Sequence, residues 1–144
     1  MDLEHTLNIL ASLVSILGLP IFISTAILLV RQLRVQTYEA IYESVLPIDQ
    51  YLLENPSLRK YLYSGQALPD SSSCEYDRVV GLADMMLTFF EHLLGQKNSM
   101  TKRKWLGWEN YMRAVYKSSP AVQYFLKANR EWYTDELKGV LGSN

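Results

Sequence analysis

The stretch Leu7–Val30 reads LNILASLVSILGLPIFISTAILLV and contains no charged side chain. About 20 apolar residues in a helix span the roughly 30 Å hydrocarbon core of a bilayer. This stretch is therefore long enough to cross a membrane with some tilt. The residues after Val30 are too polar to follow it into the bilayer. The sequence predicts a single transmembrane helix over residues 7–30 and one soluble domain after it.

A cleaved secretory signal peptide is the main alternative for this stretch. Signal peptides have a basic start, an apolar core of about 7–15 residues and a cleavage site with small residues. Here the preceding residues include Asp2, Glu4 and His5 but no Lys or Arg, and no Ala-x-Ala pattern precedes Arg31. The pattern favours a retained anchor.

The charges that flank the apolar stretch predict its orientation. Lys and Arg are held on the cytoplasmic side of a spanning helix. All 14 basic residues lie from Arg31 onward, and Arg31 and Arg34 adjoin the end of the stretch as a juxtamembrane anchor. We expect residues 1–6 outside and the soluble domain in the cytoplasm, with the protein held in the inner (cytoplasmic) membrane.

The composition of residues 31–144 narrows the classes of partner. This part carries all 14 basic residues and 13 of the 15 acidic ones, since Asp2 and Glu4 precede the apolar stretch. A nucleic-acid-binding domain usually has a basic excess, so no nucleic acid is expected as a partner. The single cysteine, Cys74, excludes an intramolecular disulfide and offers no zinc-ligand spacing. Ten Tyr and three Trp suit interfaces with partners or lipid headgroups.

The soluble part is predicted to be all-α, because no segment alternates like a strand. The first helix is expected to continue as a stalk over residues 31–46 and to stop or kink before Pro47. Ser72 and Glu75 have the spacing of a capping box at the start of a long helix. Residues 47–144 should form a cytoplasmic bundle of about four helices. The expected helical segments, of which the first two are short, are 48–54, 57–63, 75–96, 101–117 and Ser119-Pro120 to about Leu137.

The helix expected over 75–96 is apolar around most of its circumference. A surface helix needs an apolar stripe only about 100° wide. The helix should therefore be central in the bundle or covered by another subunit, and we favour a homo-oligomer. Its polar or small positions form one narrow stripe of Asp77, Gly81, Asp84, Thr88, Glu91 and Gly95.

Three carboxylates of this stripe lie one heptad apart, at Asp77, Asp84 and Glu91. They could bind a cation, or they could be the polar face of a buried helix, paired with Arg or Lys from a neighbour. Glu91 and His92 are adjacent and point to different sides of a helix, which does not suit a di-iron bundle. No nucleotide-binding or nucleophile motif is present. We therefore predict no catalytic, cofactor-binding or metal-binding residue, and no enzyme.

Two clusters could face a protein partner or lipid. The densest basic cluster lies beside Trp105 and Trp108, whose rings either join this surface or face the core. Basic residues near a membrane attract anionic headgroups. The aromatic end of the last helix could recognise a partner or dock onto the core. The predicted partner or lipid surface comprises Lys102, Arg103, Lys104, Trp132 and Tyr133.

Small and hydroxyl residues form faces within the apolar stretch. Such residues allow close approach of membrane helices and hydrogen bonds between them. The same residues could line a narrow pore in a ring of copies. The predicted packing positions are Ala11, Ser15, Gly18 and Ser24.

Several segments resemble a group of small uncharacterised bacterial proteins. These segments are YLLENPSLRKYLY (51–63), FFEH (89–92), SSPA (118–121), Phe125-Leu and Trp132-Tyr. In that group one N-terminal membrane helix precedes a helical cytoplasmic domain. The resemblance implies the same topology and no particular catalytic residue.

These features lead to one main functional hypothesis and one alternative. The main hypothesis is a non-enzymatic, membrane-anchored helical scaffold or accessory subunit that acts through self-association and partner binding. The alternative is a homo-oligomeric pore gated by its cytoplasmic domain. Membrane lipid and a protein partner or further copies are the expected contacts, without a cofactor.

Overall fold

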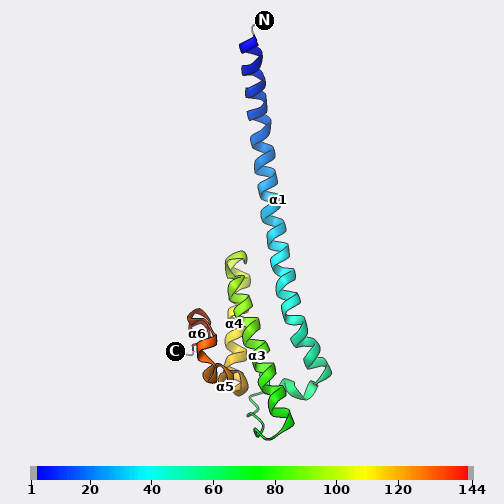
Figure 1. The fold of residues 1–144 in the computed structure, drawn as a ribbon, viewed down its shortest axis with the longest axis vertical. Coiled ribbons are helices and arrows are strands. Elements are labelled where there is room, and N and C mark those ends of the chain that lie inside the picture. Colours follow the sequence, from blue (N-terminus) through cyan, green and yellow to red (C-terminus); the bar gives the residue numbers. More distant parts are fainter. Residues whose placement is uncertain (1–2, 143–144) are drawn as a thin grey trace. The chain divides into compact units, whose positions relative to one another are not determined.

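A computed structural model describes the backbone of residues 3–142 and the side chains of Ile16 and residues 18–142. The chain divides between Gln36 and Thr37 into two compact units. The described residues contain no strand, so the all-α prediction is confirmed. The helices, joined by three single 3₁₀ turns, are α1 (Leu3–Glu54), α2 (Arg59–Tyr63), α3 (Cys74–Gly95), α4 (Lys102–Ser118), α5 (Pro120–Ala128) and α6 (Asp135–Leu141) (Figure 1).

The first unit consists of the N-terminal part of α1. The described segment Gly18–Glu54 contains a window long and apolar enough to span a membrane, and none of that window is buried. Its large side chains are open to the surroundings, and Phe22 is 71% exposed. The helix runs through Pro20 without a break. The side chains of the predicted packing positions Ala11 and Ser15 lie outside the described residues.

The second unit begins at Thr37, whereas the sequence placed the start of the bundle at residue 47. The expected end of the first helix before Pro47 is wrong, because α1 continues to Glu54. Ile41, Ile48 and Leu52 on its inner face are at most 2% exposed. This packing sustains the helix across a proline that would weaken it in isolation. The predicted helix over 48–54 is therefore the end of α1.

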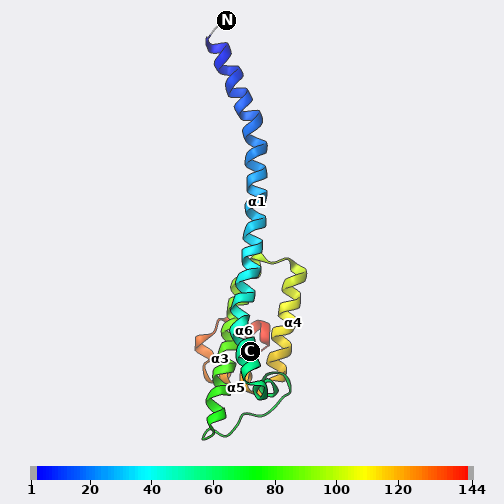
Figure 2. The ribbon, with the colours of Figure 1, turned by 90° about the vertical axis from the view of Figure 1, so that its right-hand side faces the viewer.

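α3 is the central helix of the bundle and packs against α5 and α6. In Figures 1 and 2 it lies beside the last part of α1 and beside α4. The expectation of a centrally covered helix is met within a single chain. Its buried side chains are Val79, Leu82, Ala83, Met86, Leu87, Phe89, Phe90, Leu93 and Leu94. With α2 and the end of α1, the bundle has six α-helical segments rather than about four.

The cap of α3 is Ser73 rather than the predicted Ser72. The Ser73 hydroxyl accepts a hydrogen bond from the Glu75 N–H at 3.2 Å. Ser72 is held in the preceding loop, since its N–H and its hydroxyl donate to Asp70 Oδ1 at 2.9 and 2.7 Å. These bonds keep the pKa of the Asp70 carboxyl below its ordinary value.

The last predicted helix is correct at its start and wrong in its length. Ser119 caps α5 as expected, because its hydroxyl accepts from the Val122 N–H at 3.2 Å. The helix ends at Ala128, where the Asn129 side chain donates to the Phe125 carbonyl at 3.0 Å. A separate helix, α6, then begins after Thr134, whose hydroxyl accepts from the Leu137 N–H. The second cap signal, Thr134 followed by two acidic residues, is what the sequence reading missed.

Candidate functional site

Two of the three heptad-spaced carboxylates bind the segment that joins α5 to α6. The Tyr133 hydroxyl donates to Asp84 Oδ1 at 3.2 Å. Glu91 Oε1 accepts from the Thr134 N–H at 2.7 Å and from the Thr134 hydroxyl at 3.0 Å. The partners are therefore hydroxyl and amide groups rather than the expected Arg or Lys. At these positions the acidic stripe of α3 secures the start of α6.

The remaining chemically reactive residues do not converge. Among the described residues no group of three or more His, Cys, Asp or Glu side chains could hold a metal ion. Cys74 is exposed at the first position of α3. His92 is exposed at the other end of α3 and lines a cavity of about 300 Å³ together with Ser44, Pro47, Ile48, Asp84, Met85, Thr88 and Phe89.

The predicted aromatic surface at the end of the chain is divided by the fold. Trp132 is 66% exposed, and its ring meets Phe125 edge-on with centroids 6.2 Å apart. Tyr133 is only 8% exposed, so its assignment to a partner surface is wrong. Burial, followed by the nearby Asp84 carboxylate, raises the pKa of Tyr133 well above its usual value. Trp132 alone remains available to a partner.

The predicted basic cluster lies in the first turn of α4, and Lys102, Arg103 and Lys104 are all exposed. The two tryptophans beside them are half-buried against the core. Trp108 meets Phe89 of α3 edge-on, with ring centroids 5.8 Å apart. The start of α4 therefore has a charged outer side and an aromatic inner side.

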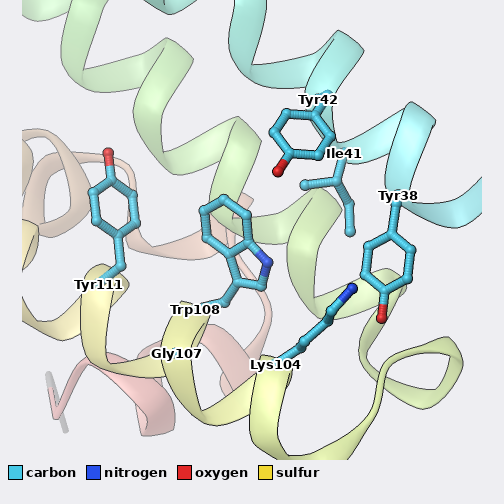
Figure 3. A pocket seen from close by; sticks show the side chains of 7 residues that line it. All are labelled: Tyr38, Ile41, Tyr42, Lys104, Gly107, Trp108 and Tyr111. Atoms are coloured by element: carbon cyan, nitrogen blue, oxygen red, sulfur yellow. The ribbon is translucent and has the colours of Figure 1, made fainter.

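A groove between α1 and α4 joins the basic cluster to aromatic rings (Figure 3). Lys104 Nζ lies 3.4 Å from the centroid of the Tyr38 ring, within cation–π range. The groove holds a cavity of about 390 Å³, inside the range of roughly 300–1,000 Å³ typical of small-molecule pockets. We call it the α1–α4 groove; it is lined by Tyr38, Ile41, Tyr42, Lys104, Gly107, Trp108 and Tyr111.

At one end of the groove the Tyr111 phenol is held in its neutral form. Burial, with a contribution from the hydrogen-bonded Tyr63, raises the pKa of Tyr111 far above its usual value. The hydroxyl oxygens of Tyr63 and Tyr111 are 3.1 Å apart. The Tyr111 ring also meets Phe90 edge-on. The groove thus has aromatic walls and one cation, that of Lys104.

A second surface feature lies on the outer side of α1 within the bundle unit. Leu46 and Leu53 are 50% and 74% exposed. Residues seven apart share one face of a helix, as in a coiled-coil seam. We call these two residues the α1 stripe. The sequence shows two apolar series on this helix, 41-48-52 and 46-53.

The groove could not be found from the sequence in the same way. It brings Tyr38 together with Lys104, residues that are far apart in the chain and on different helices. The local signal was only a pair of tyrosines four residues apart, Tyr38 and Tyr42, directly after the basic flank of the apolar stretch. Comparisons with family models, curated proteins and solved structures find no match to the chain.

Proposed function

We propose that this protein is a non-enzymatic, membrane-anchored helical scaffold or accessory subunit that acts through self-association and binding of a protein partner. The observation that carries the proposal is the exposed apolar surface of α1. Soluble monomers rarely expose contiguous apolar patches larger than a few hundred Å². Insertion into a bilayer removes this surface from water. The exposed large side chains are Ile16, Leu19, Ile21, Phe22, Ile23, Ile27, Leu28, Leu29, Val30, Leu33 and Val35.

The charges at the end of the apolar segment support the orientation with the bundle in the cytoplasm. Arg31 and Arg34 are both exposed and can reach anionic headgroups. The bundle unit that follows contains the other 12 of the 14 basic residues. The proposal puts the bundle of a bacterial protein on the cytoplasmic side of the inner membrane.

The α1 stripe supports self-association with a second copy of the chain. Two copies anchored in one membrane with the same orientation present their α1 helices in parallel and their stripes at the same distance from the bilayer. Leu46 and Leu53 would then meet their counterparts and leave water. Trp132, exposed on the C-terminal side of the bundle, remains open to a different protein.

The acidic residues of α3 support a non-enzymatic function. Asp84 and Glu91 are two of the three carboxylates for which the sequence left cation binding open as an alternative. Each instead accepts hydrogen bonds from the segment that begins α6. Their substitution is expected to weaken the bundle, which gives them a structural purpose.

Native mass spectrometry of the full-length protein in nanodiscs tests the proposal. We expect the wild-type chain to appear as a dimer or small oligomer of intact mass. Leu46→Glu with Leu53→Glu places charge in the stripe and should shift the population to monomer. Leu106→Glu is the matched control, because Leu106 is 55% exposed on α4, and it should leave the copy number unchanged.

Three outcomes would contradict parts of this proposal. A wild-type monomer would overturn self-association. A chain shortened by removal of the apolar stretch would identify a cleaved signal peptide and overturn the anchor. A closed ring of four or more copies, whose ion conductance changes in Gly18→Leu, would replace the scaffold by a pore.

A further inference from the structure

We infer that the α1–α4 groove binds the phosphate-bearing headgroup of an anionic membrane lipid. The inference rests on the proposed anchoring of the chain and adds a ligand to it. Three observations carry it: the position of the groove along the chain, the charge at its mouth and the character of its walls.

The groove begins close to the apolar segment along the chain. Tyr38 is the second residue of the bundle unit and follows Val30 by only eight residues. Eight residues of helix span about 12 Å. The Lys104 ammonium, held over the Tyr38 ring, therefore lies where the bundle begins after the apolar segment. A lipid headgroup is the anion that occurs in quantity at this level.

The charge at the mouth of the groove is positive and has no acidic neighbour in its own helical turn. The first turn of α4 contains Lys102, Arg103 and Lys104 and no acidic residue. Within residues 16–142, the ion pairs observed use Lys97, Arg113 and Lys138 rather than these three. Each basic residue near an anionic leaflet strengthens binding by about fivefold. The cluster complements a phosphodiester.

The walls of the groove favour a lipid over a free anion. Tyr38, Tyr42 and Trp108 contribute aromatic faces, and rings of this kind belong at the boundary between headgroup and hydrocarbon. A free phosphate would need polar donors around it, whereas a lipid offers glycerol and acyl carbons to the rings.

Lipid retention by the full-length protein tests the inference. The chain is purified in detergent micelles doped with phosphatidylglycerol or phosphatidylcholine, and bound lipid is counted by native mass spectrometry. We expect phosphatidylglycerol to be retained preferentially. The triple variant Lys102→Gln, Arg103→Gln, Lys104→Gln should lose this preference by at least about tenfold. The matched control Lys117→Gln, Lys127→Gln, Arg130→Gln removes equal charge from exposed sites and should keep it.

A second variant tests the cavity without changing the charge. A Cβ at Gly107 would meet nothing within 4 Å, so Gly107→Leu can extend into the groove while the helix is preserved. We expect retained phosphatidylglycerol to fall at least fivefold while the thermal midpoint of unfolding does not decrease.

Wild-type retention of phosphatidylglycerol by both the triple variant and Gly107→Leu would overturn the inference. Displacement of the lipid by inorganic phosphate alone would also overturn it, because a free anion would then be the ligand. The proposed function fails in a different way. If alkaline carbonate releases the chain from membranes, the proposed membrane anchor is refuted. If the chain stays anchored but binds lipids without selectivity, only the proposed lipid site in the groove is refuted.

Discussion

At the scale of single residues, Tyr133 shows how the fold uses a group that the sequence assigned to a surface. Its ring is buried and its hydroxyl donates to Asp84, so it joins the start of α6 to the central helix. The same hydroxyl makes the bundle sensitive to alkaline pH. The raised pKa of Tyr133 means that the fold holds the neutral form, whereas the unfolded chain ionises near the ordinary value of 10.0.

The stability contributed by Tyr133 is therefore complete below about pH 10 and is lost as the pH rises above that value. Tyr111, whose pKa is also raised by burial, acts in the same direction. We expect the free energy of unfolding to fall between pH 10 and 11.5, and to fall less steeply in Tyr133→Phe. Urea titrations of the full chain in detergent, followed by circular dichroism, would measure this difference. If the free energy of unfolding falls equally steeply with pH in both proteins, Tyr133 does not cause the sensitivity to alkaline pH.

Replacing two glycines by alanine should change the free energy of unfolding in opposite directions. Gly65 has a φ of +70°, in the left-handed region, so Gly65→Ala should destabilise the bundle by about 1 kcal/mol. Gly107 lies within α4 with open space at its Cβ position, so Gly107→Ala should stabilise by about 0.4–1 kcal/mol. The urea midpoints of unfolding of both variants at neutral pH measure these changes. Midpoints that shift in the same direction would contradict the prediction.

At the scale of elements, the short helix α6 depends on one threonine. Thr134 caps α6 through the Leu137 N–H, and Glu91 accepts both its N–H and its hydroxyl. Thr134→Ala removes the cap and one of these bonds, so we expect a loss of about 1–2 kcal/mol. Amide hydrogen exchange over residues 135–141 should accelerate more than exchange in α3.

Thr134→Ser is the control for this prediction, because serine retains the hydroxyl and caps helices equally well. Its exchange rates in α6 should stay close to those of the wild-type chain. Similar acceleration in the serine and alanine variants would show that the hydroxyl does not hold α6.

Local signals predicted the helices where capping and proline chemistry decide the boundary. Ser119-Pro120 marks the start of α5 correctly, because the serine cap and the proline both act within one turn. Pro47 was misread because its effect is overridden by the burial of Ile41, Ile48 and Leu52, which is set by distant helices. Ser72 was misread because Asp70 binds it and leaves Ser73 as the cap.

At the scale of the whole molecule, surface properties were only partly accessible from the sequence. Lys102, Arg103 and Lys104 could be placed on a surface by their charge alone. The contact of Lys104 with Tyr38 depends on the packing of α4 beside α1, which no local pattern specifies. Trp132 and Tyr133 are adjacent, yet one is exposed and the other buried, since the chain leaves the 3₁₀ turn between them.

The central claim is that α1 anchors the chain with its bundle in the cytoplasm, and Cys74 offers a direct probe of this. It is the single cysteine of the chain and is exposed. The measurement is labelling by a membrane-impermeant maleimide in intact spheroplasts and after lysis. The account predicts labelling of Cys74 only after lysis, and labelling of intact spheroplasts in an Asp2→Cys, Cys74→Ser variant. Labelling of Cys74 in intact spheroplasts would contradict the account.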